Sequence, residues 1–227
     1  MDRFDLTPYL RGEVIDIRDP LSLSLPVDKI LVDTNVLYFC YYPRYSQLVA
    51  FDEGPRNYQV KYYPDFLKEL LSSSAVLFVH GLALVEFTNL FMKHELMLLF
   101  GRVNKTSNVP KGFNFGQFSR EHPKEYFSFQ QDLQTYLNAI KEDFQLLGQD
   151  APIEKLLGDF SLKWQGSLAD AWDAMMFADA ERKKIYCILS DDAYISTIED
   201  VCLYTANKTA IDAYKKKQSS YAQRNPP

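Results

Sequence analysis

Short apolar runs alternate with longer helical segments along this chain, and that alternation constrains the fold more than any other feature. The runs are rich in Val, Ile and Leu and too short for buried helices, which is typical of strands covered on both faces of a sheet. Four of them stand out, at 30–32, 75–79, 185–189 and 201–204. Because strands joined by helical crossovers run parallel, the sequence predicts an α/β fold, a three-layer α/β/α sandwich with a mostly parallel central sheet.

The segments between these runs carry helical periodicity. Helices are expected over 62–73, 82–100 and 167–184. A further helix should begin after Pro123 and end at Gly148, because proline favours the first helical turn and glycine often follows the last. Its apolar residues recur at intervals of four, three, four and three positions: Leu133, Leu137, Ile140, Phe144 and Leu147.

The domain organisation is simple for a chain of 227 residues. We expect an N-terminal extension at 1–28, one α/β domain at 29–207 with an insertion at about 101–166, and a C-terminal tail at 208–227. No apolar run approaches the ~20 residues of a spanning helix, and the first residues do not resemble a secretory signal, so no membrane contact and a cytoplasmic location are expected.

Charge and cysteine content narrow the chemistry. A net charge of −5 disfavours a protein that coats nucleic acid along its whole surface, although a local basic patch or a bridging metal would still bind a polyanion. Cys40, Cys187 and Cys202 form no CxxC pair and are odd in number, which argues against a cysteine zinc site or a disulfide framework.

Acidic residues follow two of the predicted strands directly. In "KILVDTNVLYF" the apolar run ends at Asp33, and in "IYCILSDDAY" it ends at Ser190, Asp191 and Asp192. The carboxyl edge of a parallel sheet is where ligands bind in open α/β proteins. Helix capping and turn formation are the alternative explanation for each acid taken alone.

Three further acids lie in predicted helices. Glu86 stands among apolar residues after the second strand, and either faces solvent or has a function. Asp170 fits the S-x-x-D capping box that begins at Ser167, which makes it an N3 residue of its helix. Asp173 has no capping role in this pattern and precedes small and apolar residues, so it is the stronger candidate.

Asp33, Glu86, Asp173 and Asp192 should therefore meet at one sheet edge. Like charges about 4 Å apart repel by ~4 kcal/mol at an effective dielectric of about 20, so the cluster needs a cation to stay ionised. Oxygen ligands select Mg²⁺ or Mn²⁺, one ion or two, which activate water and stabilise a phosphodiester transition state. Asp191 and Asp170 are reserve ligands.

Polar neighbours of these acids should orient them. Thr34, Asn35 and Ser190 are the candidates, and no histidine is required. His80 ends the second strand, where backbone groups are its expected partners.

A basic and aromatic segment is the best candidate for substrate binding. It combines cations with phenylalanines, which suits single-stranded nucleic acid, and its members are Arg102, Lys105, Lys111, Phe113, Phe115, Phe118 and Arg120. The alternative is that the phenylalanines pack into the core or against a dimer partner.

Taken together, these motifs resemble the PIN domain (PilT N-terminus-like) nucleases. "VDTNVLY" resembles the first family motif with Asp33, "LVEFTNLF" the second with Glu86, and the block from Asp173 to Asp192 the closing motifs. The resemblance implies a metal-dependent endoribonuclease with a Rossmann-like sandwich that acts on RNA rather than DNA. It also implies a homodimer, and an antitoxin protein if the chain is a toxin.

Other functions compete with this interpretation. A haloacid-dehalogenase-like phosphatase needs a second Asp two residues after the first, and Asn35 stands there. A catalytically silent PIN-like module that binds RNA or a partner protein remains the alternative from a different class.

Overall fold

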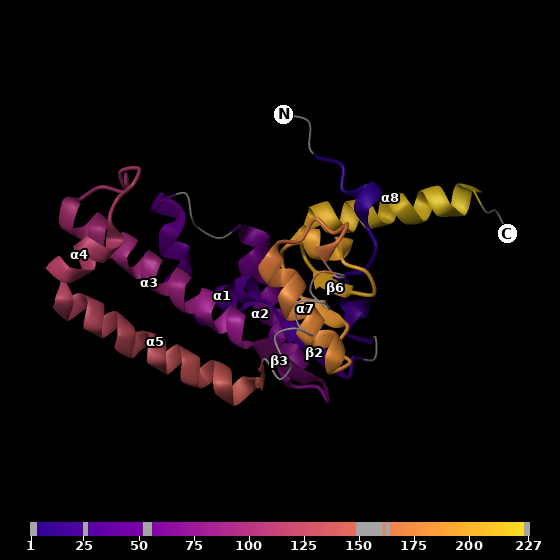
Figure 1. The fold of residues 1–227 in the computed structure, drawn as a ribbon, viewed down its shortest axis with the longest axis horizontal. Coiled ribbons are helices and arrows are strands. Elements are labelled where there is room, and N and C mark those ends of the chain that lie inside the picture. The colour runs from indigo at the N-terminus through magenta and orange to yellow at the C-terminus, as the bar shows by residue number, and fades with distance from the viewer. Residues whose placement is uncertain (1–3, 25–26, 52–55, 149–160, 162–163, 225–227) are drawn as a thin grey trace.

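The computed structural model describes residues 4–24, 27–51, 56–148, 161 and 164–224 (Figure 1). Within them, six strands form one sheet in the order β1-β6-β5-β2-β3-β4, and every neighbouring pair is parallel. The strands are β1 Glu13–Asp16, β2 Lys29–Val32, β3 Val76–His80, β4 Gln145–Leu147, β5 Cys187–Leu189 and β6 Cys202–Thr205. The predicted α/β architecture is confirmed.

Helices flank the sheet and complete a three-layer sandwich (Figure 1). The described α-helices are α1 Thr34–Tyr41, α2 Asn57–Leu71, α3 Gly81–Asn104, α4 Phe115–Glu121, α5 Pro123–Asp143, α7 Ala171–Arg182 and α8 Lys208–Arg224. Short 3-10 turns are η1 Thr7–Tyr9, η2 Pro20–Ser24, η3 Tyr45–Phe51 and η4 Ala193–Thr197. No described helix combines the length and the apolar character needed to cross a membrane.

The centre of the sheet explains why the strand predictions succeed there. Ile30, Leu31 and Val32 of β2 are buried, as expected for a strand covered on both faces. Val32 pairs with Val79 on one side and Leu189 on the other. The residues that follow these three positions therefore emerge at the same edge of the sheet.

Two strands lie where the sequence pattern predicts none. β1 pairs with β6, Val14 opposite Leu203, so part of the segment 1–28 is an edge strand of the sheet and not an extension outside it. β4 follows α5, which ends at Asp143 and not at Gly148. Leu147, which the sequence pattern assigns to the helix, therefore belongs to strand β4, where it is buried. Its spacing from Phe144 matches a helix only by coincidence.

Within the predicted insertion, α4 and α5 form a helical arm together with the long helix α3, and this arm extends from one side of the sheet (Figure 1). A hydrogen-bond network around the buried Glu95 ties the arm to the rest of the protein. Arg44 donates to Glu95 of α3 at 2.8 Å and to Asp132 of α5 at 3.1 Å, and the Tyr42 hydroxyl donates to Glu95 at 2.9 Å. The network ties both long helices of the arm to the segment after α1.

The region 208–224 is a helix that packs on the N-terminal segment (Figure 1). The Lys217 ammonium donates to the Leu10 carbonyl at 2.7 Å, and Lys216 pairs with Asp5 at 2.6 Å. The predicted tail thus begins as an ordered part of the α/β unit.

Candidate metal centre

The predicted acids lie where parallel strands end and helices begin. Asp33 directly follows β2, and Asp191 and Asp192 come shortly after β5. Glu86 lies in the second turn of α3, after β3, and Asp173 lies in the first turn of α7. Four segments distant in sequence thus contribute carboxylates to one edge of the sheet.

Asp33 is the most firmly held of these acids. Its Oδ2 accepts hydrogen bonds from the Ser190 hydroxyl and the Asn35 amide, both at 2.6 Å. Its Oδ1 accepts from the Thr34 backbone N–H at 2.7 Å, so Asp33 is also the N-cap of α1. The capping and the functional explanations of Asp33 are therefore compatible, and Asn35 and Ser190 orient the carboxylate as expected.

Thr34 connects the first acid to the second. Its hydroxyl donates to Glu86 Oε2 at 2.7 Å, although Thr34 itself is buried and Glu86 is exposed. Glu86 therefore lies on the solvent side of α3 and is still fixed next to Asp33.

Asp170 plays a different role from the predicted one. It is the N-cap of α7 and not its N3 residue, because its Oδ1 accepts from the backbone N–H of Trp172 at 2.8 Å and of Asp173 at 2.9 Å. The helix begins at Ala171, four residues later than the pattern predicts. This cap fixes the position of Asp173.

Asp191 and Asp192 point to different environments. Asp191 accepts from Tyr58, Gln59 and Tyr63 of α2, at 3.0, 2.5 and 2.8 Å, which makes it an anchor between α2 and the strand end. Asp192 caps the turn η4 by accepting from the Tyr194 N–H at 2.8 Å.

The electrostatics of the edge reflect crowded, buried carboxylates. Burial raises the pKa of Asp33 to about 6, and Glu86 and Asp192 add to the effect, while the hydrogen bonds from Ser190 and Thr34 oppose it. Burial raises the pKa of Asp173 to about 9, with further contributions from the four acids around it, Asp33, Asp170, Asp192 and Glu86. Burial also raises the pKa of Asp192, and Asp170 and Asp191 add to the rise, while the hydrogen bond from the Tyr194 N–H opposes it.

The donors suit a hard divalent cation, but they do not converge on one point. Among the described residues, no three His, Cys, Asp or Glu side chains are arranged as a ready ligand set. Repulsion acts over several ångströms, whereas ligation needs oxygens about 2.0–2.6 Å from a shared centre. The cluster therefore has the composition of a Mg²⁺ or Mn²⁺ site, and its carboxylates would have to turn inward to form one.

His80 has partners of its own. Its Nδ1 accepts from the Leu82 N–H at 3.1 Å, which caps α3, and its Nε2 bonds Asp179 of α7 at 3.1 Å. Arg182 pairs with the other oxygen of Asp179. The expected backbone partner of His80 is present, and the buried Asp179, absent from the sequence predictions, joins α7 to the end of β3.

The predicted substrate segment lies apart from the acids. Arg102 is sixteen residues beyond Glu86 on α3, about 24 Å along a helix that rises ~1.5 Å per residue. Phe113 lies edge-on to Phe100, Phe115 and Phe118, with ring centroids 4.7, 5.0 and 5.4 Å away. The alternative explanation holds for these rings, which pack within the arm. The exposed cations Arg102, Lys105, Lys111 and Arg120 lie on the same arm.

Two cavities adjoin the acid cluster. One of about 220 Å³ is lined by Leu82, Val85, Glu86, Asn89, Trp172 and Met176. The other, of about 300 Å³, has aromatic walls and reaches Asn35, Asp191 and Asp192. The sequence predictions do not include Trp172, although its place directly before Asp173 in a capped helix is a usable signal.

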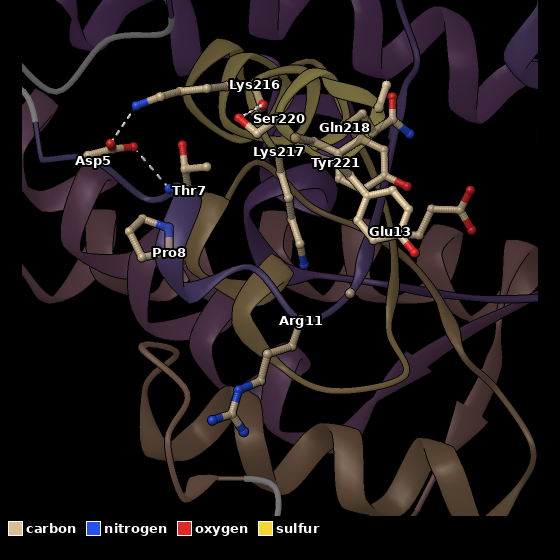
Figure 2. Close-up of a pocket in the computed structure, with 13 residues that line it drawn as sticks. Asp5, Thr7, Pro8, Arg11, Glu13, Lys216, Lys217, Gln218, Ser220 and Tyr221 are labelled. Carbon is tan, nitrogen blue, oxygen red and sulfur yellow. Dashed lines mark hydrogen bonds and ion pairs between the residues drawn. The ribbon is translucent and has the colours of Figure 1, made fainter. Parts of the chain in front are cut away.

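A larger cavity, of about 1010 Å³, lies elsewhere, between the N-terminal segment and α8 (Figure 2). Arg11, Lys216 and Lys217 line it together with Asp5 and Glu13, so charges of both signs face it. Lys216 and Asp5 form an ion pair across its rim (Figure 2). Its lining contains none of the clustered carboxylates.

Comparisons with known proteins add little to this geometry. No protein-family model matches the chain, and no curated protein matches it. Among solved structures it is similar to PAE2754 from Pyrobaculum aerophilum, with a TM-score of 0.39 and 14% identity over 83% of this chain and 90% of that chain. A similarity at this level carries no information about activity.

Proposed function

We propose that this protein is a divalent-metal-dependent ribonuclease that hydrolyses RNA phosphodiester bonds at the edge formed by Asp33, Glu86, Asp173 and Asp192. One observation carries the proposal: carboxylates from four segments meet at one edge of the sheet, where burial, together with the neighbouring acids, raises the pKa values of Asp33 and Asp173. Such crowding costs free energy in the absence of a cation, which favours a functional explanation of the cluster.

The chain's own residues prepare the site for a cation. Ser190 and Asn35 hold Asp33 through its Oδ2, and Thr34 holds Glu86 through its Oε2. Mg²⁺ or Mn²⁺ bound there would activate water and neutralise charge on the phosphate. The motif resemblance to PIN domain nucleases supports RNA as the polymer that is cut.

Metal binding and cleavage should be tested separately. The first measurement is calorimetric titration of the protein with MnCl₂ alone, and the second is cleavage of a labelled RNA with Mn²⁺, with Mg²⁺ and with EDTA. Asp33→Asn and Asp173→Asn should lose both properties. Asp65→Asn is the matched control, because Asp65 is an exposed carboxylate on α2.

The outcomes separate two classes of function. Metal-dependent cleavage that both cluster variants lose, and the control keeps, supports the nuclease. Metal binding without any cleavage would instead favour a silent PIN-like module that binds RNA or a protein. Cleavage that persists in both cluster variants would contradict the carboxylate mechanism.

A further inference from the structure

The smaller cavity beside the acid cluster is shaped by two helices that bring apolar side chains to the surface. Leu82 and Val85 come from α3, and Trp172 and Met176 come from α7. At about 220 Å³ it has room for about seven waters at ~30 Å³ each, below the ~300–1,000 Å³ of pockets for drug-sized ligands. The space suits one planar heterocycle.

Trp172 is unusually exposed for its size and position. Its relative exposure is 60%, and that of Val85 across the cavity is 59%. The Asp170 cap holds the backbone of Trp172 in the first turn of α7, so the indole stands on an ordered helix end and not on a loose loop. Exposed aromatic surface at a concave, ordered position is characteristic of binding sites.

The cavity and the acid cluster share a wall. Glu86 lines the cavity and accepts from Thr34 beside Asp33, while Trp172 directly precedes Asp173. A ligand group in the cavity is therefore next to the carboxylates. The repulsion of nearby carboxylates disfavours an anionic group there, and the exposed indole of Trp172 favours a flat, polarisable one.

We propose that this cavity binds one unpaired nucleobase of the RNA, stacked on Trp172, next to the phosphate that is cut. The inference rests on the proposed nuclease function and adds a substrate class, since a base can occupy the cavity only if it is unstacked from its own strand. Asn89 lines the same cavity and offers an amide donor and acceptor to the edge of the base.

The test uses the only two tryptophans of the chain. In Trp164→Phe the remaining indole is Trp172, so its fluorescence reports the cavity directly. The fluorescence of this variant should be measured in EDTA during titration with a short unstructured RNA, and again with the same RNA in a duplex. The single strand should quench the emission, and the duplex should not.

Affinity measurements with the same single strand complete the test. Trp172→Ala should weaken binding about 5- to 150-fold, the range for loss of one aromatic stack, and Trp172→Phe should keep most of the affinity. Trp164→Phe should bind as the wild type does. Asn89→Ala should make the affinities for the four homo-oligonucleotides more nearly equal. An unchanged order of preference would show that Asn89 does not recognise the base.

The two proposals fail in distinguishable ways. If Trp172→Ala binds and cleaves like the wild type while Asp173→Asn no longer cleaves, the nuclease stands and the base subsite is wrong. If Trp172→Ala loses affinity but the wild type shows no metal-dependent cleavage, the base subsite stands and the nuclease is wrong. Equal quenching by duplex and single strand would also overturn the subsite.

Discussion

Removing the charge of Asp173 should stabilise the metal-free protein. The side chain has a relative exposure of 8%, and its pKa is raised to about 9 by burial and by neighbouring acids. An ionised carboxylate at this position is costly, whereas an asparagine amide has a similar shape and no charge. Asp173→Asn therefore removes the free-energy cost of a buried carboxylate from the folded state, and it also removes a proposed metal ligand.

The sign and size of this effect follow from proton linkage. Between pH 3.8, the ordinary pKa, and about 9, the folded protein binds more protons at Asp173 than the unfolded chain does, so stability falls as pH rises. The slope is ~1.4 kcal/mol per pH unit, and the interval of about three pH units between 3.8 and 7 gives about 4 kcal/mol as an upper limit at pH 7. At pH 5 the difference shrinks to about 1–2 kcal/mol.

Urea unfolding in EDTA at pH 5, 7 and 8 measures this difference, with Asp65→Asn as the exposed control. Asp173→Asn should be more stable than the wild type, and increasingly so at higher pH. Added Mn²⁺ should then stabilise the wild type and leave the variant unchanged, because bound ligand stabilises only the state that binds it. A variant no more stable than the wild type at pH 8, with the same pH slope, would refute the raised pKa of Asp173.

Two other variants test the helical arm and the edge of the sheet. Glu95→Ala should destabilise the protein by about 1–3 kcal/mol, because Tyr42 and Arg44 lose the buried carboxylate to which they donate, while Arg44 keeps Asp132, and the urea midpoint will show it. A fall much below 1 kcal/mol would mean that the network does not anchor the arm. Gly12→Ala should cost about 1–3 kcal/mol, because a Cβ there would overlap the Val201 carbonyl oxygen, and an unchanged melting temperature would argue against the pairing of β1 with the sheet.

Strand β2 shows how much of the site follows from the sequence. A short run of apolar residues buried on both faces has few alternatives to a central parallel strand, and the acid that follows it must emerge at the sheet edge. The same local rule places Asp192 after β5. Helical periodicity likewise places Glu86 and Asp173 near the starts of their helices. These features are local because hydrophobic period and helix start are set by neighbouring residues.

The edge strands and the partners of each acid were decided by tertiary structure. β1 and β4 are short and become strands only through pairing with a neighbouring strand. The partner of β1 lies almost two hundred residues later, as the pairing of Val14 with Leu203 shows. Tyr63 holds Asp191 from 128 residues away.

The sequence by itself thus determined which residues reach the carboxyl edge of the sheet. Only the folded chain decided that Asp191 anchors α2 and that Trp172 faces a cavity beside Glu86. The reason is physical: periodicity and strand ends are local properties, whereas hydrogen-bond partners, burial and cavities exist only once distant segments have packed together.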